Sequence, residues 1–253
     1  MVYDLQKAGL WKRIAAWMFD GILTGILAVG IALLLSVLLG YDGYSHAVDA
    51  AYAKYEQEYG VTFELSQEAF DAMTEEQLQR YQEAYDALIQ DSDAMYHYNM
   101  MLNLSLIIAS LGILLAVLLW EFVIPLRLGN GQTLGKKIFS LCLVRQDGVK
   151  LNHMQLFART VLGKFTIEIM LPVYILFLTF WGAMGLMGTV VLFALAAAQL
   201  LCIALSRTNS AIHDLLAGTV VVDITSQMIF RTTEELIEFK KRVAAEQAAR
   251  KPY

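Results

Sequence analysis

A few charged side chains of this sequence stand beside or inside long apolar stretches, where an ion is costly and its presence is therefore informative. Arg13 and Asp20 are seven residues apart. This spacing is nearly two helical turns, so both would lie on one helix face, with Asp20 roughly 10 Å deeper in apolar surroundings. A carboxylate at that depth is retained when it is paired or hydrated. Because desolvation favours its neutral form, it can exchange a proton or hold a cation.

Other ionisable residues extend this pattern. Glu121 and Glu168 stand at the ends of apolar stretches, either as boundary residues or as parts of a polar path with Asp20. Two strand-like runs, 140–144 and 219–223, could pair and bring Asp214 close to Arg13. We interpret the cluster as an ion or proton site or, alternatively, as a structural salt bridge that locks the first helix; its members are Arg13, Asp20, Asp214, His213, Glu121 and Glu168.

The remaining motifs argue against most other chemistries. No Ser/His/Asp or Cys/His grouping has catalytic spacing and no HExxH motif occurs, so we expect no enzyme, no metal site and no cofactor. The segment Gly131–Lys137 (GQTLGKK) lacks the spacing of a phosphate-binding loop, and neither a nucleotide nor a nucleic acid is an expected partner. Lys136 and Lys137 are instead predicted to contact the phosphates of the lipid bilayer.

Three stretches without Asp, Glu, Lys or Arg have to position these residues. Each is long enough to cross a bilayer, because about 20 apolar residues span about 30 Å of hydrocarbon. The third, 169–206, is 38 residues long and contains three glycines near its middle, which favours a turn between two spans. We therefore predict an all-α membrane protein with four transmembrane helices, three being the alternative, at 14–39, 99–124, 165–183 and 187–206.

Basic residues are distributed unevenly, and this predicts the orientation. Residues 41–98 hold thirteen Asp or Glu but only Lys54 and Arg80, whereas the other seventeen of the nineteen basic residues lie at 1–13, 125–164 or 207–253. Loops rich in Lys and Arg stay in the cytoplasm. Both termini and the loop 125–164 are therefore predicted to be cytoplasmic, and a small β element is expected on that side.

The segment 40–98 is predicted to be a folded, helical, acidic insert outside the cytoplasm. Nine of the twelve tyrosines lie there, enough for two helices to bury a shared seam. Gly60 would end the first helix, and Thr74 opens a capping box for a second helix that could run unbroken into the next span. The insert is interpreted as a solvated acidic cap, with attraction of cations or a basic partner as the alternative.

The tail 207–253 is predicted to hold an amphipathic helix at 232–251, capped at Thr232, with an apolar face of Leu236, Phe239 and Val243. This helix would lie on the membrane surface or serve as a solubilising tail.

Three blocks in a fixed order resemble the RDD family of bacterial membrane proteins. They are Arg13 with Asp20 in the first span, the GQTLGKK segment after the second, and the segment HDLLAGT (213–219) after the fourth. The family takes its name from an arginine and two aspartates, which here would be Arg13, Asp20 and Asp214. The long acidic insert departs from the short loop that typical members have at this place.

The resemblance implies a multi-pass protein of the bacterial cell membrane and a small transporter, coupled to an inorganic cation or a proton. Four spans are few to enclose a translocation path, so a homo-oligomer is expected. The alternative is a non-transporting membrane adaptor or scaffold, whose charged cluster is structural and whose insert, loop and tail dock other proteins.

Overall fold

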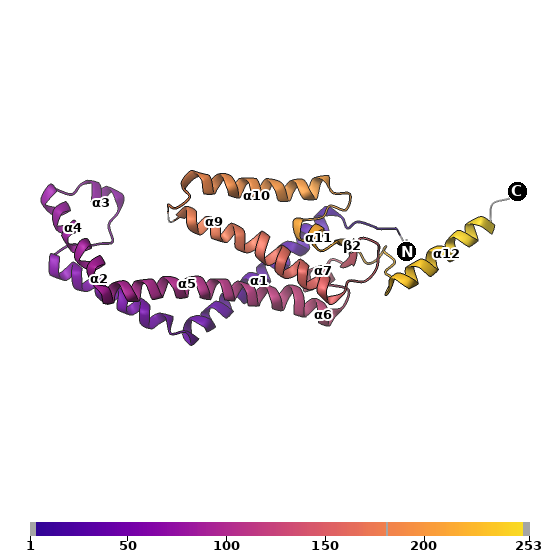
Figure 1. Ribbon diagram of the computed structural model, residues 1–253, viewed down its shortest axis with the longest axis horizontal. Helices are drawn as coiled ribbons and strands as arrows, with labels where there is room; N and C mark the ends of the chain where they lie inside the picture. Colours follow the sequence, from indigo (N-terminus) through magenta and orange to yellow (C-terminus); the bar gives the residue numbers. More distant parts are fainter. Residues whose placement is uncertain (1–3, 181, 250–253) are drawn as a thin grey trace. The chain divides into compact units, whose positions relative to one another are not determined.

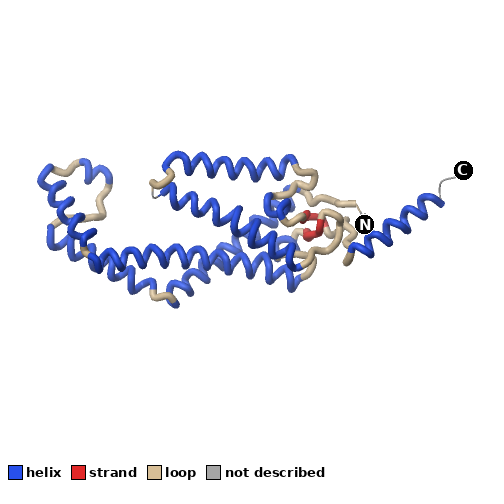
Figure 2. The backbone as a smooth tube through the Cα atoms, in the orientation of Figure 1, coloured by secondary structure: helices blue, strands red, loops and turns tan. Residues whose placement is uncertain are grey.

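The computed structural model describes residues 4–180 and 182–249 of this mostly helical protein (Figures 1 and 2). Among these residues, four helices are long and apolar enough to cross a membrane, and two strands form one small sheet. The predicted fold class is thereby confirmed. The chain separates into two compact units, one formed by the residues up to 28 and from 114 onward, the other by residues 29–113. They are described in turn.

The four spanning helices are built from continuous helical segments. The first is α1 (Leu10–Leu38) and the last is α10 (Gly185–Leu205). The second and third each contain a π-helical segment with wider turns. The second joins α5 (Ser92–Leu118), η1 (Leu119–Val123) and α6 (Ile124–Leu128), and the third joins α8 (His153–Phe157), η2 (Ala158–Met170) and α9 (Leu171–Phe180).

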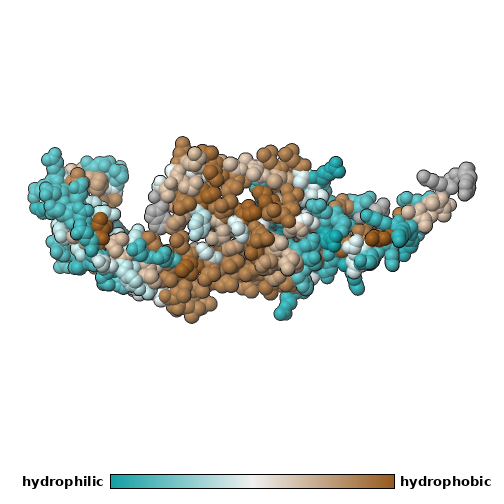
Figure 3. All heavy atoms as spheres, in the orientation of Figure 1, coloured by the Kyte–Doolittle hydropathy of each residue, from teal (hydrophilic) through white to brown (hydrophobic). Residues whose placement is uncertain are grey.

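A glycine turn divides the longest apolar stretch, as the sequence predicts. Gly182 and Gly185 have φ angles of 74° and 50°, a region that only glycine adopts without strain. Helices α9 and α10 consequently run back alongside each other (Figure 1), and apolar side chains cover this pair (Figure 3). This is the surface expected for helices in lipid.

Two of the spanning helices are longer than predicted. The second was expected to end before Pro125 but continues to Leu128. The Ile124 N–H donates to the Leu119 carbonyl five residues back, and Pro125 then falls in the first turn of α6, where its missing N–H is tolerated. The third begins at His153 rather than near 165. As a result, Arg159 and Lys164 lie on a spanning helix and not in the preceding loop.

The predicted strand pairing is confirmed. Strand β1 (Leu141–Arg145) pairs antiparallel with β2 (Thr219–Asp223), with Leu143 opposite Val221. One face packs on Ala8, Ala16 and Leu156. The other face buries residues of both strands under partly buried apolar side chains: Cys142, Val144, Val220 and Val222 under Leu5, Ile224 and Ile229. Burial raises the pKa of the Cys142 thiol to about 12, so this cysteine is an inert core residue.

The start of α1 is fixed to this sheet. The Ala8 N–H donates to the Val221 carbonyl at 3.2 Å, and the Lys12 ammonium donates to the Asp223 carboxylate at 2.7 Å. Hydrogen bonds from Lys12 and Thr225 lower the pKa of Asp223 to about 2. The sheet therefore determines where the first turns of α1 lie.

The tail helix α12 (Thr233–Ala249) packs on the same region. Leu236 is buried against Val149 and Phe230, and the rings of Phe230 and Phe239 are 5.3 Å apart. Thr232 caps the helix by accepting a hydrogen bond from the Glu235 N–H. At Leu236 and Phe239 the predicted apolar face thus covers protein, while a position on the membrane surface and a solubilising role stay predictions.

The other unit contains the acidic insert. Helices α2 (Tyr41–Tyr59) and α4 (Glu75–Gln90), with the short α3 (Gln67–Asp71) between them, bury a seam around Tyr55, Leu88 and Ala94. Gly60 ends α2 in the left-handed conformation, and Thr74 forms the predicted capping box with Gln77. The seam and both end signals are confirmed.

The expected continuity between α4 and α5 is wrong. Asp91 interrupts the two helices with an extended backbone, and its carboxylate accepts hydrogen bonds from the N–H groups of Asp93 and Ala94. These bonds, that from Ala94 above all, lower the pKa of Asp91. Asp91 therefore caps the spanning helix that follows it.

Candidate functional site

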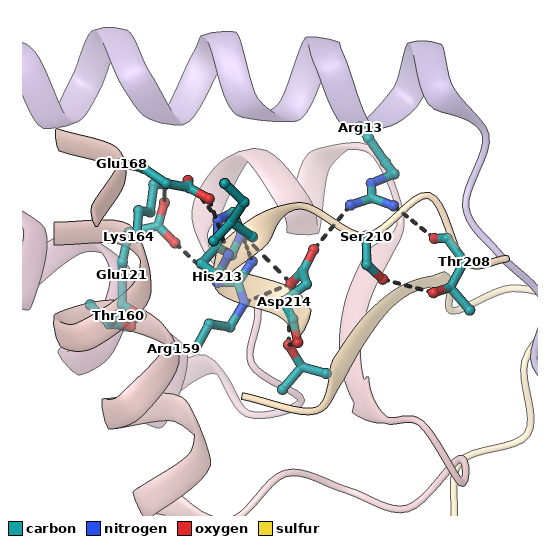
Figure 4. Close-up of polar contacts among 12 residues, drawn as sticks. Arg13, Glu121, Arg159, Thr160, Lys164, Glu168, Thr208, Ser210, His213 and Asp214 are labelled. Atoms are coloured by element: carbon teal, nitrogen blue, oxygen red, sulfur yellow. Dashed lines mark hydrogen bonds and ion pairs between the residues drawn. The ribbon is translucent and has the colours of Figure 1, made fainter. Parts of the chain in front are cut away.

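Asp214 lies at the centre of a buried ionic network in the first unit (Figure 4). It belongs to the short helix α11 (Ile212–Leu216), directly before β2. Arg159 Nε is 2.9 Å and Arg13 Nη2 is 3.1 Å from its two carboxylate oxygens, and the Thr219 hydroxyl donates at 3.2 Å. Burial alone would raise the pKa of Asp214, but the charges of Arg159 and Arg13 hold it well below the ordinary value.

Arg13 also holds the loop that leads to α11. Its Nη1 donates to the carbonyl oxygens of Thr208 and Asn209, at 3.1 and 2.5 Å. Within this loop, the side chain of Ser206 accepts a hydrogen bond from the Ser210 N–H. The predicted approach of Asp214 to Arg13 is confirmed, and the geometry shows that one arginine secures both the aspartate and the loop that presents it.

His213 connects Asp214 with Glu168. Its Nδ1 is 2.7 Å from Glu168 Oε2, and its Nε2 is 2.8 Å from Arg159 Nη2. A guanidinium can only donate, so Nε2 must accept and the ring hydrogen must be on Nδ1, where it is donated to Glu168. The contact therefore fits a neutral imidazole in one tautomer. Gln199 of α10 donates to Glu168 at 2.9 Å and links the fourth span to this pair.

Glu121, in η1, is the second centre of the network. It is 1% exposed and lies 3.3 Å from Lys136 Nζ, and Lys164 donates to its other oxygen. Arg159 Nη1 is 3.8 Å away and, among the described residues, has no hydrogen-bond partner although it is buried. Arg159 is thus held firmly by Asp214 and only electrostatically by Glu121.

Asp20 is bound by the GQTLGKK segment. Its carboxylate accepts hydrogen bonds from Trp120 Nε1 at 3.0 Å, from the Gly135 N–H at 2.8 Å and from the Thr133 hydroxyl. A Cβ atom at Gly135 would lie 2.6 Å from the Ala16 carbonyl oxygen and 2.8 Å from the Asp20 carboxyl. Only glycine allows this close approach of α7 (Leu134–Ile138) to α1.

The prediction for Lys136 is wrong. This lysine is 8% exposed and points to Glu121, with Asp20 at 3.9 Å, and does not face lipid phosphates. Burial lowers its pKa, which its carboxylate partners partly offset. Lys137 is exposed, and its contact with lipid stays a prediction. Adjacent residues of a helix point about 100° apart, so Lys136 and Lys137 could have been expected to face different surroundings.

The six predicted residues are brought together, but not as one direct cluster. Arg13 is hydrogen-bonded to Asp214, whereas Asp20 is hydrogen-bonded to the GQTLGKK segment. These two residues of α1 therefore lie at opposite ends of the network. Lys136, Glu121 and Arg159 connect these ends. Arg159, which was not predicted, and Lys136, which was predicted to contact lipid phosphates, therefore complete the path.

Arg159 and Lys164 were not predicted as members of the network because both were assigned to the loop 125–164, whereas they lie on the π-helical segment η2. They are five residues apart, which an α-helix at about 100° per residue would place about 140° away from each other. The i→i+5 turns of η2 bring them to roughly the same face, and both reach Glu121. Gly163 lies between them and leaves room for His213. A Cβ atom added at Gly163 would lie 2.6 Å from the Cβ atom of His213.

The charges of the network balance. Four carboxylates (Asp20, Glu121, Glu168, Asp214) face four cations (Arg13, Lys136, Arg159, Lys164), and four minus four leaves no net charge while His213 is neutral. No group of three or more His, Cys, Asp or Glu in the described part of the chain could hold a metal ion.

Comparison with known protein families finds a match for most of the chain. The family model of the RDD family matches residues 7–218, which include every member of the network. No curated protein and no solved structure matches the chain.

Proposed function

Because the chain belongs to the RDD family of membrane proteins, we propose that it is a small transporter in which the buried network couples movement of an inorganic cation to a proton. The observation that supports this is the position of His213, an imidazole held by hydrogen bonds between Glu168 and Arg159 inside the network. We also propose that both termini face the cytoplasm of a bacterial cell and that the transporter is a homo-oligomer.

The proton would act through Arg159. When Nε2 of His213 gains a proton, it can no longer accept from Arg159 and becomes a donor, with Asp214 Oδ1 at 3.6 Å. Protonated His213 and Arg159 then compete for Oδ1 of Asp214, while Arg13 stays on Oδ2. Glu121, 3.8 Å from the unpartnered Nη1, is the carboxylate to which Arg159 can shift. The proton thus shifts the Arg159 guanidinium from Asp214 on α11 towards Glu121 on the second spanning helix, and its release reverses the step.

A structural role is the second candidate, and a specific observation favours it. Asp20, Glu121 and Asp214 each have a lysine or arginine partner within 4.0 Å, Glu168 is hydrogen-bonded to His213, and these contacts tie α1, η1, α7, η2 and α11 together. Truncating one partner of a buried pair is strongly destabilising. In this case the protein is a membrane adaptor, and the network only fixes its inner end.

Ion flux in proteoliposomes tests the proposal. Purified protein is reconstituted with an internal pH indicator, and a sodium or potassium gradient is applied. We expect proton movement with the wild type and its loss in His213→Gln, Asp20→Asn and Asp214→Asn. His153→Gln is the matched control, because His153 is exposed at the start of α8.

The outcomes separate the two candidates. Folded wild-type protein that moves none of the three ions contradicts transport of cations or protons. Flux that persists in His213→Gln at the wild-type rate leaves transport intact and removes the histidine from it. Loss of flux together with loss of folding, in all three variants alike, favours the structural role, and thermal unfolding measured on the same preparations detects it.

A further inference from the structure

The insert contains a small pocket whose polar lining consists of tyrosines. It has a volume of about 100 Å³ and is bordered by α2, α4 and the first turns of α5. Tyr52, Tyr85 and Tyr98 each come from a different one of these helices, and Val48, Leu88 and Met95 lie between them. Tyr85 is 49% exposed, so the pocket is not sealed from solvent.

These three tyrosines have no assigned structural partner for their hydroxyl groups. Among residues 4–180 and 182–249, none of the three hydroxyls makes a hydrogen bond to another residue, whereas the Tyr55 hydroxyl donates to Asp91 at 2.9 Å and that of Tyr41 accepts from Ser105. Burial and the neighbouring tyrosines raise the pKa of Tyr52, which keeps its phenol neutral. The pocket is therefore lined by aromatic side chains that carry neutral hydroxyl groups.

The surroundings of the pocket carry a strong negative charge. Residues 41–98 hold thirteen Asp or Glu against Lys54 and Arg80. Both of these bases are engaged, Lys54 with Asp91 at 3.5 Å and Arg80 with Glu76 at 2.7 Å. Asp49 and Asp86, which directly follow the lining residues Val48 and Tyr85, are exposed. A field of this sign concentrates cations and repels anions at the pocket.

We propose that this pocket binds an organic ammonium cation and that a quaternary ammonium group fits it best. Aromatic faces attract such cations, and a set of aromatic rings is the usual way in which proteins recognise a methylated ammonium group. A cavity of roughly 150 Å³ holds benzene. This smaller, open pocket takes the charged head group and leaves the rest of the ligand outside. No carboxylate lines it, which disfavours a bare metal ion.

Binding of choline to the purified full-length protein tests the proposal, with calorimetry as the readout. Its neutral isostere, in which a carbon atom replaces the nitrogen, is the control ligand of equal shape. We expect choline to bind at least tenfold more tightly than the isostere, and raised salt to weaken choline alone. Equal binding of the two ligands, or no binding of choline to folded protein, would overturn the proposal.

Substitutions locate the site. Tyr85→Leu removes a ring from the pocket and is expected to weaken choline binding about tenfold, while Tyr85→Phe keeps the ring face and most of the affinity. Tyr96→Leu is the matched control, because Tyr96 is 53% exposed but does not line the pocket. An equal loss in Tyr85→Leu and Tyr96→Leu would contradict the assignment.

The ammonium group could belong to a free solute or to a lipid head group, and the bilayer composition distinguishes these sources. Nanodiscs made only of phosphatidylglycerol carry no quaternary ammonium, whereas those made of phosphatidylcholine do. Choline binding that disappears in phosphatidylcholine supports a head group as the occupant, and binding that is equal in both supports a free solute. None of these results depends on the ionic network, so the site in the insert and the proposed transport succeed or fail separately.

Discussion

Charged side chains play opposite parts in the two units of the molecule. In the ionic network, Asp20, Glu121 and Asp214 are at most 1% exposed and each of the three faces a lysine or arginine. In the insert, the pair Arg80 and Glu76 is largely exposed and most carboxylates have no cation beside them. Water weakens a surface pair to about 0–1 kcal/mol, whereas a buried charge that loses its partner costs roughly 3–5 kcal/mol.

The two units obtain their stability from different interactions. The insert is held by an aromatic and aliphatic seam and by helix caps, and its charges set the field around it. The network instead has to keep its charges matched. Removing one charge should therefore be severe in the network and almost unnoticed in the insert.

The largest effect is expected for Glu121→Gln. It leaves Lys136, Lys164 and Arg159 without the carboxylate that they share, and we expect the free energy of unfolding to fall by roughly 3–5 kcal/mol. Glu83→Gln, on the exposed face of α4, is the control and should change it by less than about 0.5 kcal/mol. Thermal unfolding in detergent measures both. Equal effects would remove the contrast between the units.

Two glycine-to-alanine substitutions should change the free energy of unfolding in opposite directions. Gly135→Ala places a Cβ atom against the Ala16 carbonyl oxygen and is expected to destabilise by roughly 1–3 kcal/mol, with rearrangement around Asp20. Gly43→Ala meets nothing within 4 Å on α2 and should stabilise by roughly 0.5–1 kcal/mol. Denaturant titration followed by tryptophan fluorescence reports the first change directly, because Trp120 donates to Asp20. A neutral Gly135→Ala would refute the close approach.

Removing a helix cap should affect the insert alone. Thr74→Ala deletes the hydroxyl that accepts from the Gln77 N–H, and we expect a local loss of about 1 kcal/mol. Amide hydrogen exchange should accelerate in α4 and stay unchanged in η2. Faster exchange in both would mean that the two units unfold together. Gln79→Ala, an exposed change inside α4, controls for the alanine itself.

The smallest effect is expected at the Lys12 and Asp223 pair. Lys12 is half exposed, so Lys12→Met should cost at most about 1 kcal/mol. The folded-state pKa of Asp223, about 2, is below its ordinary value of 3.8. The carboxylate therefore stabilises the fold above pH 3.8, and this contribution is lost as the pH falls towards 2. The stability difference between wild type and Lys12→Met should shrink over this interval, and a constant difference would contradict the pairing.

Much of the architecture follows from local sequence properties. Hydropathy and the absence of charge indicated four spans, and the glycines at 182 and 185 indicated the turn between the last two. Alternating apolar residues indicated the strands that pair as β1 and β2, and this pairing brought Asp214 to Arg13. Caps at Gly60 and Thr74 were also predictable, because each depends on a few neighbouring residues.

The partners within the network could not be predicted in the same way. Asp20 and Gly135 are 115 residues apart, and only packing of α7 on α1 brings the N–H to the carboxylate. Arg159 and Lys164 share Glu121 because η2 has π-helical turns, and an α-helical reading places them on different faces. Lys136 points into the protein, where its ammonium group pairs with the buried carboxylate of Glu121. That pairing depends on the tertiary structure.

The sequence by itself thus determined that this is a four-span protein of the RDD family with an acidic insert, since apolar length and charge segregation are properties of the chain alone. The tertiary structure decided which cation meets which carboxylate and where His213 sits among them. The physical reason is the low dielectric of the buried site. There a charge is stable only beside its opposite, and that proximity is a matter of three-dimensional distance.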